Sequence, residues 1–183
     1  MQLPGPHNLS NVLAALAVGR ELKISFEAAK AALEAFKPSA SRMELLTLKS
    51  GIRLIDDCYN ANPSSTQAAL KTLAGLKGRE ASLAILGEML ELGAFTEEGH
   101  RQVGQSAAQE GTDRLIAVGP HAKSILAGAR QAGMEDRRLR SFADPEAAVA
   151  ALSEVPEGTK WILVKGSRGI HLEKIVAHLK EKF

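Results

Sequence analysis

Short apolar runs alternate with longer amphipathic stretches along most of the chain. The runs have the length of strands, and the stretches repeat apolar residues at helical spacing. Short, continuously apolar strands joined through helices are typical of a parallel sheet covered on both faces. The expected strands are residues 44–48, 52–56, 82–86, 114–118, 139–142 and 161–164, and the expected helices are residues 64–76, 97–110, 121–132, a helix capped by Asp144, and residues 170–182. The sequence therefore predicts an α/β fold with a Rossmann-like, mainly parallel sheet.

The N-terminal part of the chain departs from this alternation. Lys49-Ser50-Gly51 separates the first two strands and predicts a β-hairpin on the N-terminal side of the sheet. Two helices precede it, one over about residues 8–20 and one from an N-cap at Ser25 to about residue 36, followed by a linker at 38–41. The side chains expected to face inward are Val12, Leu13, Leu16, Ala17, Phe26, Ala29, Leu33 and Phe36. Because two short helices cannot enclose a core, we expect residues 1–38 to end one domain and residues 39–183 to form another.

Composition narrows the class of protein. The net charge of +2 and the absence of a long basic run argue against a nucleic-acid groove. No apolar run approaches the ~20 residues of a membrane span, and no signal peptide opens the chain. The one cysteine, Cys58, excludes an internal disulfide, fits the cytoplasm, and is expected to be a bystander thiol.

Polar residues and glycines gather where the expected strands end. In an open α/β sheet, ligands bind beyond these carboxyl ends. The loop after residue 55 is the richest, because it supplies acceptors and amides that suit a ribose hydroxyl or a cation, namely Asp56, Asp57, Tyr59, Asn60 and Asn62. The alternative is structural: Asp56 pairs with a nearby lysine, while Asn60 and Asn62 cap the next helix.

Two other motifs have the same double interpretation. Lys165-Gly166-Ser167-Arg168-Gly169 joins a strand to a helix, where glycine permits close approach and a helix N-terminus favours an anion; a plain turn with a serine cap is the alternative. Asn8 and Asn11 lie three residues apart on one helical face, where their amides suit a base edge; capping is the alternative.

Other candidates are discounted. His100 and His178 are expected on the solvent side of their helices, and His171 lies near the glycine turn without a clear role. No Cys/His spacing resembles a zinc site, and neither G-x-x-x-x-G-K-[ST] nor G-x-G-x-x-G occurs. We therefore expect no metal site and no phosphate-binding P-loop in this chain.

Taken together, in order, the motifs resemble the Mur ligases. His7-Asn8-x-x-Asn11 before an alanine-rich helix is similar to the end of the family's central ATPase domain, and Arg42 falls where the family has an interdomain arginine. The subtype that adds D-Ala-D-Ala to UDP-N-acetylmuramoyl-tripeptide is matched by Asp57-x-Tyr59-Asn60-Ala61-Asn62-Pro63-x-Ser65, Leu86-Gly87-Glu88-Met89-x-Glu91-Leu92-Gly93 and Lys165-Gly166-Ser167-Arg168. Glu88 stands where this subtype more often has aspartate.

The resemblance implies ATP-dependent amide formation through an acyl phosphate in peptidoglycan precursor synthesis, with Mg²⁺ and cationic groups stabilising charge. It implies that Asn8 and Asn11 contact adenine or its surroundings, Arg42 the phosphates and Asp57 the ribose. Tyr59, Asn60 and Asn62 would line the same nucleotide pocket. The side chains implied to face the two peptide substrates are Glu88, Glu91, Lys165, Gly166, Ser167 and Arg168.

The resemblance also implies that the chain is a C-terminal portion. The family's P-loop, metal ligands, modified lysine and UDP-binding domain all precede the matched residues, so residues 1–38 would be the tail of the central ATPase domain. We therefore expect no complete catalytic set here, no ligation by this chain alone and weak ATP binding. Two other classes remain open: a receiver-like signalling domain, suggested by Asp56, Asp57 and Lys165, and a non-catalytic α/β binding module.

Overall fold

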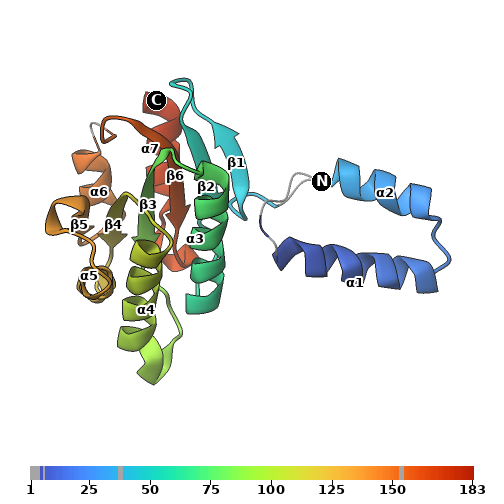
Figure 1. Ribbon diagram of the computed structural model, residues 1–183, viewed down its shortest axis with the longest axis horizontal. Coiled ribbons are helices and arrows are strands. Elements are labelled where there is room, and N and C mark those ends of the chain that lie inside the picture. Colours follow the sequence, from blue (N-terminus) through green and yellow to red (C-terminus); the bar gives the residue numbers. More distant parts are fainter. Residues whose placement is uncertain (1–4, 6, 37–38, 153–154) are drawn as a thin grey trace.

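A six-stranded sheet forms the centre of the protein. The computed structural model describes residues 5, 7–36, 39–152 and 155–183. The strand order is β1-β2-β6-β3-β4-β5 (Figure 1). The strands are β1 (Glu44–Thr47), β2 (Arg53–Asp57), β6 (Thr159–Lys165), β3 (Ala81–Gly87), β4 (Arg114–Val118) and β5 (Leu139–Phe142). Only the pair β1 and β2 is antiparallel, which confirms the predicted hairpin and the mainly parallel sheet.

Helices cover both faces of this sheet, as predicted. Apolar side chains of α3 (Pro63–Lys77), α4 (Thr96–Gln109) and α5 (Ala122–Gln131) form one buried cluster with the sheet. Those of α6 (Pro145–Ala151) and α7 (Glu173–Lys182) form a second cluster with it. α7 begins three residues later than expected, because Arg168–Ile170 forms a 3₁₀ turn and His171 adopts a left-handed φ of 60°.

The topology places three strand ends where a ligand site is expected. β6 lies between β2 and β3, yet α7, which follows β6, packs on the opposite face from α3 and α4. Neighbouring strands whose connections leave towards opposite faces open a crevice beyond their carboxyl ends. The turns bearing Asp57, Glu88 and Lys165 therefore lie at one edge of the sheet, as the sequence predicted.

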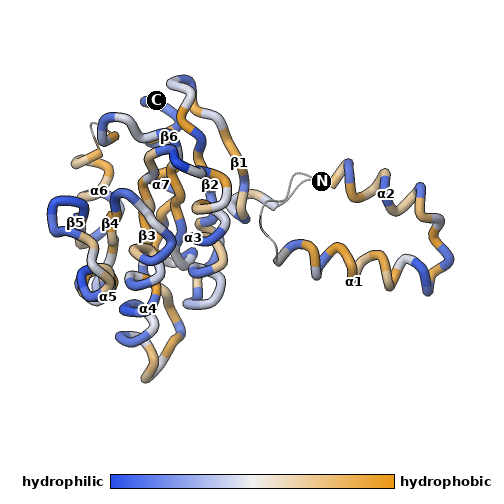
Figure 2. The backbone as a smooth tube through the Cα atoms, viewed as in Figure 1, coloured by the Kyte–Doolittle hydropathy of each residue, from blue (hydrophilic) through white to orange (hydrophobic). Residues whose placement is uncertain are grey.

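The N-terminal helices form a separate pair. α1 (His7–Glu21) and α2 (Phe26–Ala35) extend away from the sheet (Figure 1). The Ser25 cap is confirmed, since its Oγ accepts from Ala28 N at 3.2 Å. The expectation of an inward apolar face is wrong for Ala17, which is exposed, and for Leu13, Phe26 and Phe36, which are 58 %, 68 % and 49 % exposed. Among the residues that the structure describes, no further layer covers these helices (Figure 2).

The helices α4 and α5 are in backbone contact. A Cβ added to Gly104 would lie 1.8 Å from Ile125 O, and one added to Gly128 would lie 1.9 Å from Arg101 O. Only glycine therefore permits this separation between the two helices.

We expect Gly104→Ala to lower the free energy of unfolding by about 3 kcal/mol, because the added methyl group forces the helices apart. Gly75→Ala on α3 is the control, since nothing lies within 4 Å of its added Cβ, and it should stabilise by about 0.5–1 kcal/mol. Urea unfolding of both variants measures the difference, and equal effects would contradict the proposed contact.

Candidate functional site

A cleft of about 640 Å³ lies at the carboxyl ends of β2 and β6 and reaches the start of α1. This volume is within the range of small-molecule sites. Its lining includes all seven residues that the resemblance assigns to the nucleotide, Asn8, Asn11, Arg42, Asp57, Tyr59, Asn60 and Asn62, together with Lys165. It also includes residues that were not assigned to the nucleotide, of which only Ser65 belongs to a quoted motif: Phe36, Ser39, Met43, Ser64, Ser65, Ala68 and Ala69.

The base of the cleft is a buried ion pair. Lys165 Nζ lies 2.7 Å from Asp57 Oδ2 and donates to Asn60 O at 2.9 Å. Met43 N donates to Asp57 Oδ1 at 3.1 Å. Burial raises the pKa of the Asp57 carboxyl, and the positive charge of Lys165 opposes this shift. Lys165 thus lines the same cleft as the residues that the resemblance assigns to the nucleotide, whereas the resemblance implied a peptide-facing role for it.

The loop after β2, here called the Asp57 loop, contains further polar side chains that hydrogen-bond to the backbone of the loop and of the start of α3. Asn62 Oδ1 accepts from Ser65 N at 2.8 Å, and Ser65 Oγ accepts from Asn62 N, so the capping interpretation of Asn62 is confirmed. Asn60 does not cap α3; its Oδ1 accepts from Ala61 N. Asp56 pairs with no lysine among the described residues and instead accepts from Ser41 Oγ at 3.0 Å.

The end of the linker is held against this loop. Tyr59 N donates to Ser41 O at 3.0 Å, and Met43 N donates to Asp57 Oδ1. The residues directly before and after Arg42 in the sequence are therefore both hydrogen-bonded. Ser41 and Met43 both have positive φ, 57° and 54°, a conformation that is uncommon outside glycine. Such strain persists where surrounding contacts determine the backbone, so the position of Arg42 is well defined.

The exposed side chain of Arg42, at the end of the linker, packs on the ring of Tyr59. Arg42 Cζ lies 3.8 Å from the centroid of the Tyr59 ring, which is a cation–π distance. In the part of the lining that α1 contributes, Asn11 Nδ2 donates to Asn8 Oδ1 at 3.3 Å. The cleft therefore offers both amide groups and a guanidinium.

The Glu88–Gly93 loop and the turn after β6 are interlocked beside the cleft. Ser167 N donates to Glu88 O at 3.0 Å, and Leu90 N donates to Ser167 Oγ at 3.0 Å. Gly166 packs so closely that an added Cβ would lie 3.2 Å from Gly87 Cα. Ser167 and Gly166 are thus buried structural residues, while Arg168 and Glu91 are exposed.

Glu88 faces the protein interior, contrary to the expected substrate-facing role. Its Oε1 lies 2.5 Å from His121 Nδ1 and its Oε2 accepts from His121 N at 3.1 Å. A receiver-like domain would need an aspartate at the end of β3 to accept a phosphoryl group. Gly87 ends this strand instead, and the carboxylate of the next residue, Glu88, contacts His121.

His100 is fully buried, so its expected surface position is wrong. Its Nδ1 contacts Thr96 O at 2.6 Å, and its Nε2 accepts from Met89 N at 2.9 Å. With Glu88 and His121 it places three ligand-type atoms within 4.8 Å of one another. A metal ion would have to displace the Met89 hydrogen bond, so hydrogen bonding explains this group better than metal binding.

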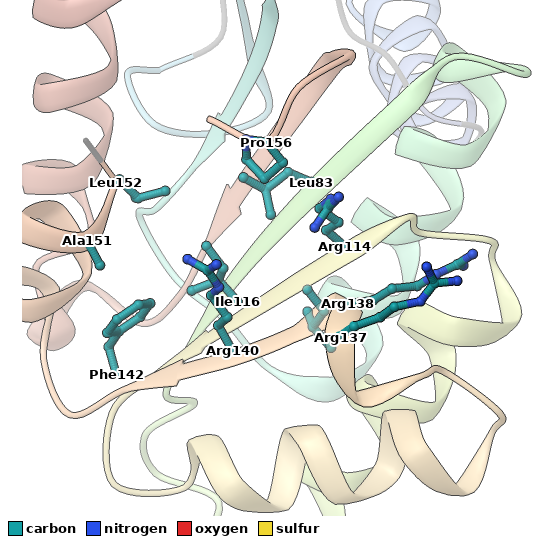
Figure 3. Close-up of a pocket in the computed structure, with 11 residues that line it drawn as sticks. Leu83, Arg114, Ile116, Arg137, Arg138, Arg140, Phe142, Ala151, Leu152 and Pro156 are labelled. Carbon is teal, nitrogen blue, oxygen red and sulfur yellow. The ribbon is translucent and has the colours of Figure 1, made fainter. Parts of the chain in front are cut away.

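A second cavity lies away from every predicted site residue. It lies among Leu83, Ile116 and Phe142, with four arginines around it: Arg114, Arg137, Arg138 and Arg140 (Figure 3). Its volume of about 30 Å³ is close to that of one water molecule, so it cannot hold a nucleotide.

Comparison with known proteins decides the family. The profile of "Mur ligase, glutamate ligase domain" matches residues 41–168. The chain belongs to the Mur ligase family. It is 34 % identical to UDP-N-acetylmuramoyl-tripeptide--D-alanyl-D-alanine ligase of Bacillus subtilis, over 97 % of this chain and 38 % of the relative, and 36 % identical to that of Escherichia coli, over 99 % and 38 %. MurF from Acinetobacter baumannii superimposes with a TM-score of 0.83 at 31 % identity, over 97 % of this chain and 38 % of that one.

This Mur ligase chain therefore spans 38 % of the length of these two curated relatives. None of the helices in the described parts of the chain has the length and apolarity needed to cross a bilayer.

We expect Lys165→Met to lower the free energy of unfolding at neutral pH by about 3–5 kcal/mol, because it leaves the Asp57 carboxylate buried and unpaired. Burial favours the protonated carboxyl in the folded state, so the loss should shrink as the pH falls towards the normal range of an aspartate. Adding Asp57→Leu should recover most of the loss. Urea unfolding at several pH values measures both effects, and additive losses in the double variant would contradict the pairing.

We also expect His100 to make stability pH-dependent. Burial lowers the pKa of this imidazole, so its stabilising contribution is complete above the usual histidine value of 6.5 and is lost as the pH falls. Between pH ~7.5 and ~5.5 the protein should lose up to about 1.4 kcal/mol per pH unit. His100→Gln should flatten this dependence. Equal slopes for the parent chain and His100→Gln would contradict the assignment.

Proposed function

We propose that the chain is the C-terminal portion of an ATP-dependent ligase that adds D-Ala-D-Ala to UDP-N-acetylmuramoyl-tripeptide in the cytoplasm. In this proposal residues 1–38 are the tail of the central ATPase domain, and residues 39–183 are the C-terminal domain. The relatives from Bacillus subtilis and Escherichia coli, which carry this activity by name, share at least a third of their matched residues with the chain.

One observation carries the proposal. Residues from α1, the linker, the Asp57 loop and β6 line one cleft, although they lie far apart in the sequence. The cleft combines side-chain amides, which suit a base edge, with Arg42, whose planar guanidinium suits a phosphate. Asp57 keeps free lone pairs beside those used by Lys165 and Met43, so it can also accept from a ribose hydroxyl.

The described residues of the cleft suit a nucleotide better than a Mg²⁺ ion. Their one carboxylate, Asp57, is neutralised by Lys165. No step is therefore assigned to a metal held by this chain, and we propose that Mg²⁺ is bound by residues of the full-length enzyme outside it.

In the proposed reaction the tripeptide carboxylate attacks the γ-phosphate of ATP and releases ADP. The amine of D-Ala-D-Ala then attacks the acyl phosphate, forms the amide and releases phosphate. This chain would orient the nucleotide through the cleft and stabilise phosphate charge through Arg42. Positioning and charge stabilisation are the main sources of catalysis in phosphoryl transfer.

The chain alone should not catalyse this reaction. It contains no P-loop, and large apolar side chains of α1 and α2 such as Leu9, Leu13 and Phe26 are mostly exposed, as expected for helices covered by further residues in a larger protein. We propose correspondingly weak ATP binding by this chain.

The test joins this chain to the upstream residues of the Bacillus subtilis relative, in place of that relative's matched segment. The chimera should form the D-Ala-D-Ala adduct of the tripeptide in an ATP-dependent reaction, measured by mass spectrometry and ADP release. Arg42→Ala should lower the rate at least about tenfold, because a charged hydrogen bond is worth about 1.5–3 kcal/mol. Arg140→Ala, at an exposed arginine of β5, should not.

A folded chimera that binds the tripeptide substrate but forms no ATP-dependent adduct would overturn the proposal. Adduct formation by the 183-residue chain alone would contradict the incomplete site.

A further inference from the structure

Two arginines from different segments converge on one tyrosine ring. Arg42 Cζ, at the end of the linker, lies 3.8 Å from the ring centroid of Tyr59, and Arg168 Cζ, in the turn after β6, lies 5.4 Å from it. Tyr59 and Arg42 line the cleft and Tyr59 is 39 % exposed, so the three side chains meet at the surface beside the cleft rather than in the core.

Neither guanidinium has a carboxylate partner among the residues that the structure describes. The nearby acids are already engaged, Asp57 by Lys165 and Asp56 by Ser41. The negative face of an aromatic ring attracts each cation but does not neutralise it. Two positive charges therefore converge at one place, and each guanidinium has more N–H donors than its hydrogen bond to the Tyr59 phenol uses.

Both arginines extend from anchored backbone. Arg42 lies between Ser41 and Met43, which are hydrogen-bonded to the loop after β2 in left-handed conformations. Arg168 follows Ser167, whose main chain and side chain are bound to the Glu88 loop. A pair of cations held in this way loses little conformational freedom when an anion binds.

We propose that Arg168 is a second phosphate-binding residue beside Arg42, and that Tyr59 is the positioning residue that holds the two guanidinium groups together. The ligand class is a polyphosphate, because guanidinium groups bind phosphate oxygens in a bidentate manner and two of them match adjacent phosphates. This deepens the proposed function, on which it rests for the identity of the nucleotide. It replaces the peptide-facing role that the resemblance implied for Arg168.

The phenol of Tyr59 reports on this group. Hydrogen bonding and positive charge from Arg42, and then charge from Arg168, lower its pKa. Tyr59 is the only tyrosine in the chain, so the ultraviolet absorbance of the phenolate follows this one residue. An anion bound between the arginines would cancel their effect and raise the pKa.

The experiment titrates this chain with pyrophosphate at constant ionic strength and measures affinity by calorimetry. Arg168→Gln should weaken binding about fivefold to tenfold, as expected for one charge-assisted contact at an exposed site. Arg140→Gln is the control for loss of one exposed arginine and should bind as the parent does. Tyr59→Phe should retain affinity because the ring remains, whereas Tyr59→Leu should lose it. In the parent chain pyrophosphate should also raise the phenol pKa.

The following results would each overturn one of the two proposals. Equal pyrophosphate affinity in the parent and Arg168→Gln, or a phenol pKa that pyrophosphate leaves unchanged, overturns the proposal. Acetate binding as tightly as pyrophosphate overturns the phosphate class. If adenosine perturbs the nuclear magnetic resonance signals of Asn8 and Asn11 while pyrophosphate does not bind, the proposal of two phosphate-binding arginines fails and the proposed function stands. If pyrophosphate binds but a folded chimera that binds the tripeptide substrate forms no ATP-dependent adduct, the proposed function fails and the arginine pair stands.

Discussion

The buried ion pair between Asp57 and Lys165 is the interaction on which the candidate site depends. It joins the carboxyl ends of β2 and β6, at the point where the sheet topology opens a crevice. Removing two charges from water is costly, and the direct contact, together with the hydrogen bonds from Met43 N and to Asn60 O, compensates for that cost. The same contacts fix the linker, from which Arg42 extends, and the loop, from which Tyr59 extends. The ion pair therefore determines the shape of the cleft, although other side chains supply the exposed charge at its edge.

Much of the fold could be predicted from the sequence, because local patterns determine it. Apolar runs, glycine turns and caps such as Asp144 gave the order of the elements and the edge at which strand ends meet. The roles of individual side chains at that edge depend on contacts between distant residues. Asp57 and Lys165 are 108 residues apart, and no local pattern shows that one neutralises the other.

His100 shows where the pattern itself was misjudged. The buried residues of α4 are Gly99, His100, Val103, Gly104 and Ala107, which follow helical spacing. Two glycines and a histidine obscure this apolar face when residues are classified by polarity alone. Glu88 was misjudged for a related reason: a carboxylate after a strand was expected to face a ligand, yet His121 satisfies it from a different loop.

The backbone contact between α4 and α5 has a consequence for the neighbouring loops. His100 of α4 accepts a hydrogen bond from Met89 N. His121, the residue directly before α5, contacts the Glu88 carboxylate. Because Gly104 and Gly128 bring the two helices into direct contact, the histidines share one rigid support, and their rings stack with centroids 5.0 Å apart. The loop after β3 is therefore coupled mechanically to a helix interface, so that sequence variation remote from any bound molecule can still alter how that loop is presented.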